Sequence, residues 1–148
     1  MLAIRKATRV IKVLILAGLF LLFDQASKRL VALRTDAEPI ACGRLLKIRP
    51  TSNPQAMLRA GNPRVILPLL WLIALVSAML LYQSGVWFRS ESALLGLGLA
   101  FGGAAGNILD LLRRNCVLDF IDVGWWPVFN LADVGIVAGL VIAFWPRG

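Results

Sequence analysis

Four long apolar stretches, separated by shorter polar segments, set the pattern of this chain. They cover residues 10–33, 65–82, 93–112 and 128–145. A helix of about 20 apolar residues is needed to cross the hydrocarbon core of a bilayer, and each stretch approaches or exceeds that length. The pattern therefore predicts an all-α membrane protein with four transmembrane helices, built as a single membrane-embedded domain over residues 1–148.

The longest polar segment, residues 34–64, separates the first two apolar stretches. It contains four prolines and two glycines, which disfavour long helices. The run 44–49 predicts a short strand, and residues 55–60 predict a brief amphipathic turn. We therefore expect a small β-containing segment outside the membrane, on the extracytoplasmic side.

Basic residues indicate the orientation of the chain in the membrane. Four of them, and no acidic residue, lie before or at the start of the first apolar stretch: Arg5, Lys6, Arg9 and Lys12. Cytoplasmic flanks are enriched in Lys and Arg, so the N-terminus is predicted to be cytoplasmic, and four crossings return the C-terminus to the same side. The segment 34–64 also carries six basic residues, which runs against this rule.

An excess of sixteen basic over eight acidic residues also occurs in nucleic-acid-binding proteins. Here the basic residues lie beside apolar stretches, so we expect membrane lipids rather than nucleic acid as partners. The chain has no histidine and only two cysteines, Cys42 and Cys116, so no metal or other cofactor is expected. A bridge between the cysteines is one alternative, and two free thiols are the interpretation we favour. We expect a monomer.

Small residues recur at helical spacing in the last two apolar stretches. Gly98, Gly102 and Gly106 are each four residues apart, and Gly135 and Gly139 repeat the spacing. Such ridges allow helix backbones to approach closely in lipid. We therefore expect these glycines to lie at helix contacts.

Acidic residues carry the main chemical signal, because several lie in or beside apolar sequence. A charge at the centre of a membrane helix costs about 2.5–3.5 kcal/mol on insertion scales, so such residues are functional candidates. Three pairs share a helix face by their spacing: Asp24 with Lys28, Asn107 with Asp110, and Asn130 with Asp133. All three pairs come at the predicted outward ends of their helices, and Asp119 and Asp122 follow the third helix. These polar side chains are expected to converge near the outer surface.

The acids differ in the partners that the sequence offers them. Asp24 has a cation at Lys28, which favours a structural or positioning role. Asp119 and Asp133 have no such partner nearby except Arg113 and Arg114. Two carboxylates brought together would share one proton, so that one could activate water and the other could donate a proton to a carbonyl group. Buried acids also serve as proton or ion sites in small coupled transporters, or as polar contacts between helices, and spacing alone does not choose among these functions.

The motifs around these residues resemble those of lipoprotein signal peptidase, also called signal peptidase II. The resemblance runs from Asp24 to Asp133, with the order, spacing and membrane position of every motif in agreement. Four motifs carry it: D-Q-x-x-K at Asp24, Gln25 and Lys28; G-N-x-x-D at Gly106, Asn107 and Asp110; V-x-D-F at Val117, Asp119 and Phe120; and F-N-x-A-D at Phe129, Asn130, Ala132 and Asp133.

This resemblance implies an aspartic endopeptidase of the bacterial inner membrane, with Asp119 and Asp133 as its catalytic dyad. It implies a site near the outer face and a precursor lipoprotein substrate, cut just before a cysteine that carries diacylglycerol. It also implies substrate-binding or supporting roles for six further residues: Asp24, Lys28, Asn53, Asn107, Asp110 and Asn130.

Two departures from the family pattern fall where the family meets its substrate. The outer loop of the family reads N-x-G-x-A-F, whereas here Asn53 is followed by Pro54, Gln55, Ala56, Met57 and Leu58. The arginine that usually follows the third-helix aspartate is replaced by Leu111. An alternative interpretation is therefore that the chain is a divergent paralogue of this family, with an altered substrate preference.

Overall fold

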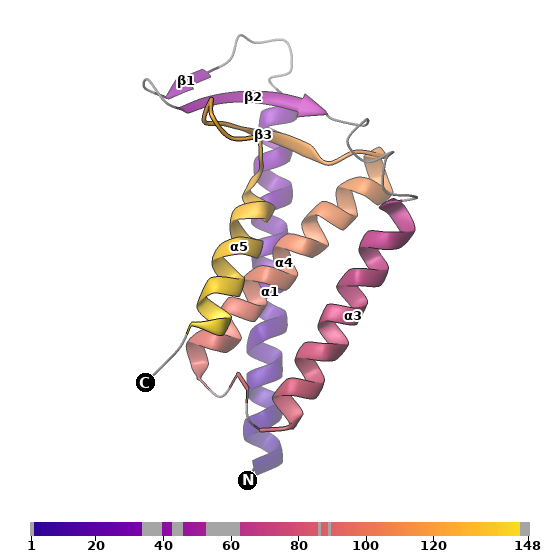
Figure 1. Cartoon of the computed structure of the whole chain (residues 1–148), viewed down its shortest axis with the longest axis vertical. Helices are drawn as coiled ribbons and strands as arrows, with labels where there is room; N and C mark the ends of the chain where they lie inside the picture. Colours follow the sequence, from indigo (N-terminus) through magenta and orange to yellow (C-terminus); the bar gives the residue numbers. More distant parts are fainter. Residues whose placement is uncertain are drawn as a thin grey trace.

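The computed structural model describes residues 2–33, 40–42, 46–52, 63–85, 87–88 and 90–145. Its elements are α1 (Leu2–Ala32), β1 (Ile40–Cys42), β2 (Leu46–Ser52), α3 (Pro63–Gln83), α4 (Glu91–Arg114), β3 (Leu118–Asp122) and α5 (Leu131–Phe144). The helices form a bundle, and the sheet lies across the end of it that is opposite the two chain termini (Figure 1). The all-α membrane architecture with a small β-containing segment is confirmed.

Three helices in the described part of the chain, α1, α3 and α4, are long and apolar enough to cross a membrane. The fourth, α5, has only 14 residues and a length of about 21 Å. The predicted span 128–145 was therefore too long at its start. Phe129 instead forms a β-bridge with Ile121, and Asn130 caps the helix. A capping side chain fixes where a helix begins, even when the apolar sequence starts earlier.

The ends of α4 follow from local sequence. Ser90 is the N-cap, and its hydroxyl accepts a hydrogen bond from the Ala93 backbone N–H at 3.2 Å. Arg113 and Arg114 lie in the last turn, where positive charge complements the helix dipole. Asn115 then adopts a left-handed backbone with φ of 65° and ends the helix.

The predicted glycine contacts are confirmed by the packing of α4. A Cβ atom on Gly102 would lie 2.5 Å from the carbonyl oxygen of Ala17 in α1. On its other side, a Cβ on Gly96 would lie 2.5 Å from the carbonyl oxygen of Gly139 in α5. Only glycine permits these approaches, so α4 packs directly against both α1 and α5.

The sheet joins two distant parts of the sequence. The predicted strand over 44–49 is observed as β2, shifted to Leu46–Ser52, and it pairs antiparallel with β1 on one side and β3 on the other. The β2–β3 register shifts between Ile48 and Thr51, at the position of Pro50, which has no N–H to donate. Thr51 is the partner of Asp119 in this register, so β2 covers the strand that carries a candidate catalytic residue.

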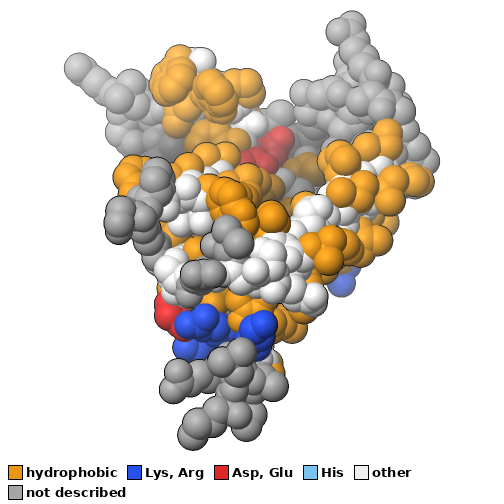
Figure 2. All heavy atoms as spheres, turned by 60° about the horizontal axis from the view of Figure 1, so that its bottom comes forward, with side chains coloured by type: hydrophobic (Ala, Val, Ile, Leu, Met, Phe, Trp, Pro, Cys, Tyr) orange, Lys and Arg blue, Asp and Glu red, His pale blue; other side chains and the backbone are white. Residues whose placement is uncertain are grey.

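The surface of the bundle has apolar flanks and one charged end. Hydrophobic side chains cover the flanks, and basic side chains gather near the start of α1 (Figure 2). At this end Glu91 forms ion pairs with Arg9 at 3.3 Å and with Lys12 at 3.1 Å. These pairs are substantially exposed, so they contribute little to stability.

Candidate active site

Lys28 lies at the centre of a polar cluster whose charged side chains are fully buried. Its ammonium nitrogen is 2.9 Å from Asp24 Oδ2, 2.8 Å from Asp110 Oδ2 and 2.9 Å from Asn107 Oδ1. An ammonium group has three N–H donors, so these three acceptors satisfy it completely. Lys28, Asp24 and Asp110 each have no exposed side-chain surface. The ion pair between Lys28 and Asp110 therefore links α1 to α4 through side chains that have no contact with solvent.

The cluster carries one net negative charge, and α5 helps to offset it. Asp24 Oδ1 accepts a hydrogen bond from the backbone N–H of Ala132 at 2.9 Å, in the first turn of α5. The partial positive charge of a helix N-terminus stabilises a carboxylate there. Gly106 makes the arrangement possible, because a Cβ on that residue would lie 2.5 Å from Asp24 Oδ2.

Gln25 completes this cluster, although its motif gave it no assigned role. Its side-chain amide nitrogen lies 3.2 Å from each of three oxygens: Asp24 Oδ2, Asp110 Oδ1 and the carbonyl oxygen of Gly106. Its position one residue from a buried acid is the sequence signal for this contact. Gln25 therefore helps to satisfy both buried carboxylates.

Asn107 connects the buried cluster to Asp133. Its Oδ1 accepts hydrogen bonds from Lys28 and, at 3.0 Å, from Asn130 Nδ2. The opposite side of the same amide, Nδ2, donates to Asp133 Oδ1 at 2.8 Å. Because Lys28 only donates, it requires the oxygen of Asn107 on its side and so directs the N–H group toward Asp133.

Asn130 holds both candidate catalytic carboxylates. It is the N-cap of α5 in a capping box: its Oδ1 accepts from the Asp133 backbone N–H, and its own N–H donates to Asp133 Oδ2, each at 3.0 Å. Its Nδ2 also donates to Asp119 Oδ1 at 2.8 Å. One helix cap thus positions one carboxylate from β3 and another from α5.

The carboxyl group of Asp119 has a pKa above the usual value for an aspartate. Burial removes water from its carboxyl group and, together with the neighbouring charge of Asp133, raises its pKa from 3.8 to about 6. The hydrogen bond from Asn130 opposes this shift. A raised pKa keeps a proton on Asp119 over a wider pH range.

Both carboxylates open onto an apolar groove of about 820 Å³ between α3, α4 and α5. Asn107, Asp119 and Asp133 are at one end of it. Residues such as Trp71, Phe101 and Leu140 form its walls. The site therefore combines a pair of carboxylates with a surface that suits a lipid-like or apolar ligand.

The described chain brings together seven of the eight candidate residues proposed from the motifs; Asn53 lies outside the described residues. Asp122 lies apart, at the other end of β3, where its Oδ1 accepts a hydrogen bond from the Gly124 N–H at 2.9 Å. Leu111 is fully buried, and Cys116 carries a free thiol. In the part of the chain that is described, no cluster of three His, Cys, Asp or Glu side chains is arranged to hold a metal ion.

The fold and site define a polytopic membrane protein with paired carboxylates at the mouth of an apolar groove. The sequence profile of the family described as signal peptidase (SPase) II matches residues 16–146. The chain belongs to this family.

Individual relatives agree with this assignment. The lipoprotein signal peptidase of Moorella thermoacetica is 37% identical over 140 residues, which cover 89% of each chain. That of Rhodococcus jostii is 34% identical over 139 residues, covering 86% of this chain and 68% of the relative. A solved structure described as a bacterial membrane enzyme superposes with a TM-score of 0.75 over 88% of each chain at 22% identity, and so shares the fold.

Proposed function

We propose that this protein removes signal peptides from lipoprotein precursors by aspartic peptidase chemistry, cutting before a cysteine that carries diacylglycerol. The observation that supports this most is the arrangement around Asn130, which holds Asp119 and Asp133 at the mouth of an apolar groove. Relatives with the name lipoprotein signal peptidase support the substrate class.

The two carboxylates have different environments, which suggests different roles. Asp133 accepts hydrogen bonds from Asn107 Nδ2 and from the Asn130 N–H, and such donors favour a charged carboxylate. Asp119 accepts a side-chain hydrogen bond from Asn130 Nδ2 and lies beside the Asp133 charge. We therefore assign the proton of the resting dyad to Asp119 and the negative charge to Asp133.

The reaction follows from this assignment. Asp133 takes a proton from a water molecule while the oxygen of that water attacks the scissile carbonyl carbon. At the same time the proton of Asp119 passes to the carbonyl oxygen. The tetrahedral intermediate then collapses. Asp133 gives its proton to the leaving nitrogen, and a hydroxyl group of the intermediate returns a proton to Asp119. The products are a free carboxyl group, a free amine and the starting dyad.

The orientation of the chain is part of the proposal. Basic residues gather at the start of α1 (Figure 2). In Figure 1 that end of the bundle is opposite β3 and the first turn of α5, which carry Asp119 and Asp133. By the positive-inside rule this end faces the cytoplasm, which puts both termini there and the dyad near the outer face of the bacterial membrane. We propose that the protein acts there as a monomer.

Purified protein in detergent tests this function with a synthetic precursor that carries a diacylglyceryl cysteine. We expect two fragments, with the new N-terminus at the lipidated cysteine, and no requirement for added metal, nucleotide or cofactor. The matched control is the same precursor without the lipid. An absence of cleavage, together with proton-coupled flux in proteoliposomes, would instead favour the alternative function of a small coupled transporter.

A further inference from the structure

The segment between β3 and α5 forms a short hairpin. Its base is a β-bridge in which the backbone N–H of Ile121 donates to the carbonyl oxygen of Phe129 at 2.8 Å, and that of Phe129 donates back at 3.1 Å. Within the hairpin, Gly124 has a left-handed backbone with φ of 81°, and its N–H donates to Asp122 Oδ1. Glycine adopts this conformation without strain, so the turn follows from its own sequence. The tip of the hairpin is therefore held relative to β3 and α5.

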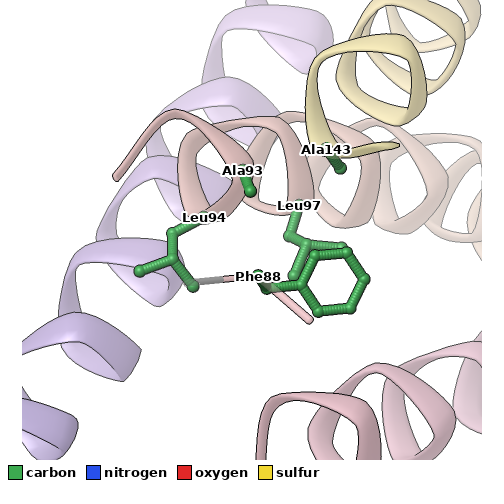
Figure 3. Packing of buried hydrophobic residues seen from close by; sticks show 5 residues of the cluster. All are labelled: Phe88, Ala93, Leu94, Leu97 and Ala143. Atoms are coloured by element: carbon green, nitrogen blue, oxygen red, sulfur yellow. The ribbon is translucent and has the colours of Figure 1, made fainter. Parts of the chain in front are cut away.

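Trp125 and Trp126 lie at the tip of this hairpin. Their ring centroids are 5.8 Å apart in an edge-to-face arrangement, and 81% and 58% of their surfaces are exposed. An aromatic residue that packs inside the bundle differs sharply. Phe88 is 4% exposed and lies beside Leu97 in the buried cluster (Figure 3). The tryptophan pair thus presents a large aromatic surface that the described part of the chain leaves uncovered.

The length of α1 places the hairpin at the surface of the membrane. At the end of the bundle with the chain termini, Lys12 and Glu91 form an exposed ion pair, and such charges stay outside the hydrocarbon. From Lys12 to Ala32, α1 spans about 30 Å, which is the thickness of the hydrocarbon core. Its far end contacts β2 and β3, at the end of the bundle that carries the sheet (Figure 1). The hairpin that follows β3 therefore lies where hydrocarbon meets headgroups.

Tryptophan is well suited to this boundary. Its ring is apolar, whereas its indole N–H is a donor that headgroup and ester oxygens can accept. Tryptophan is enriched at both membrane surfaces for this reason. A protein partner fits less well, because two indole rings bury about 300–500 Å² at most. A stable protein interface buries about 800 Å² per partner, so the lipid surface is the better match.

We infer that Trp125 and Trp126 anchor the hairpin in the lipid headgroup region and thereby fix the depth of the dyad in the membrane. Asp119 lies in β3, which leads into the hairpin, and Asp133 lies in the first turn of α5, which follows it. A tip held at one depth therefore holds both carboxylates near one depth. The anchoring stands without the proposed function, whereas its effect on cleavage rests on that function.

Paramagnetic lipids test the anchoring directly. The full chain, made with fluorinated tryptophan, is placed in phosphatidylcholine nanodiscs, and its fluorine NMR signals are assigned from single tryptophan-to-phenylalanine variants. The Trp125 and Trp126 signals should broaden with a spin label near the lipid headgroup, and much less with one at the end of an acyl chain. Trp71, near the middle of α3, is the internal control and should show the opposite preference. Broadening of the Trp125 and Trp126 signals by a water-soluble paramagnetic ion alone, or by none of these reagents, would overturn the anchor.

Cleavage in a bilayer tests the effect on the dyad. In the double variant Trp125→Ser, Trp126→Ser, kcat/KM for a diacylated precursor should fall in nanodiscs, yet match the wild type in detergent, where no bilayer imposes a depth. The matched control Trp125→Tyr, Trp126→Tyr should keep the wild-type value in both, because tyrosine also favours the membrane surface. Wild-type cleavage by the serine variant in nanodiscs would overturn the role in dyad depth. If the wild type cleaves nothing in detergent, the proposed function fails, and the NMR result still decides the anchor.

Discussion

Lys28 and Asn107 are joined by a hydrogen bond of 2.9 Å that connects the buried charges to the carboxylate pair. Lys28 has no acceptor to offer, so it fixes the amide of Asn107 with its N–H group toward Asp133. The residues that stabilise the bundle are thus the same ones that orient a candidate catalytic group.

Removal of the Lys28 charge should strongly destabilise the protein. In Lys28→Met, Asp24 and Asp110 remain buried without their cation, and we expect a loss of about 3–5 kcal/mol in unfolding free energy. Adding Asp110→Asn to this variant should recover part of the loss, although Asp110→Asn alone should destabilise. Denaturant unfolding in detergent of the wild type, the two single variants and the double variant measures these changes in unfolding free energy. If Asp110→Asn destabilises the protein equally with and without Lys28, the ion-pair account is contradicted.

Gly106 should tolerate no side chain. In Gly106→Ala the new Cβ would lie 2.5 Å from Asp24 Oδ2, so Asp24 must move and loosen its bond to the N-terminus of α5. We expect a loss of about 1–3 kcal/mol in stability and a large loss of cleavage. Gly18→Ala is the matched control, because no atom lies within 4 Å of its added Cβ. Equal thermal stability of both variants would contradict this packing.

The sequence predicted the helices and most of the site because those signals are local. The length of each apolar stretch predicted a membrane span. The four-residue spacing of Asp24 and Lys28 predicted that they lie on the same helix face. The third strand, β3, was not predicted, since its pairing with β2 joins segments about 70 residues apart in the sequence. The groove was also missed, because its shape depends on how far α3 stands from α4 and α5.

The pH dependence of cleavage should report Asp119. Its proton is available below its pKa of about 6 and is lost above it. We therefore expect kcat/KM to fall about tenfold per pH unit on the alkaline side of that value. In Asp133→Asn, the neighbouring charge is gone, so the pKa of Asp119 should decrease; a carboxyl NMR titration measures it. An unchanged pKa in this variant would contradict the coupling of the two carboxylates.

The roles of Asp119 and Asp133 are tested most directly by cleavage rates of three asparagine variants on one diacylated precursor. Asp119→Asn and Asp133→Asn should each lower the rate by about 10³-fold or more while the protein stays folded, because an amide can neither donate a carboxyl proton nor act as the base. Asp122→Asn should retain substantial activity, since an amide oxygen can still accept the bond from the Gly124 N–H. Near-wild-type cleavage by either dyad variant would contradict the account.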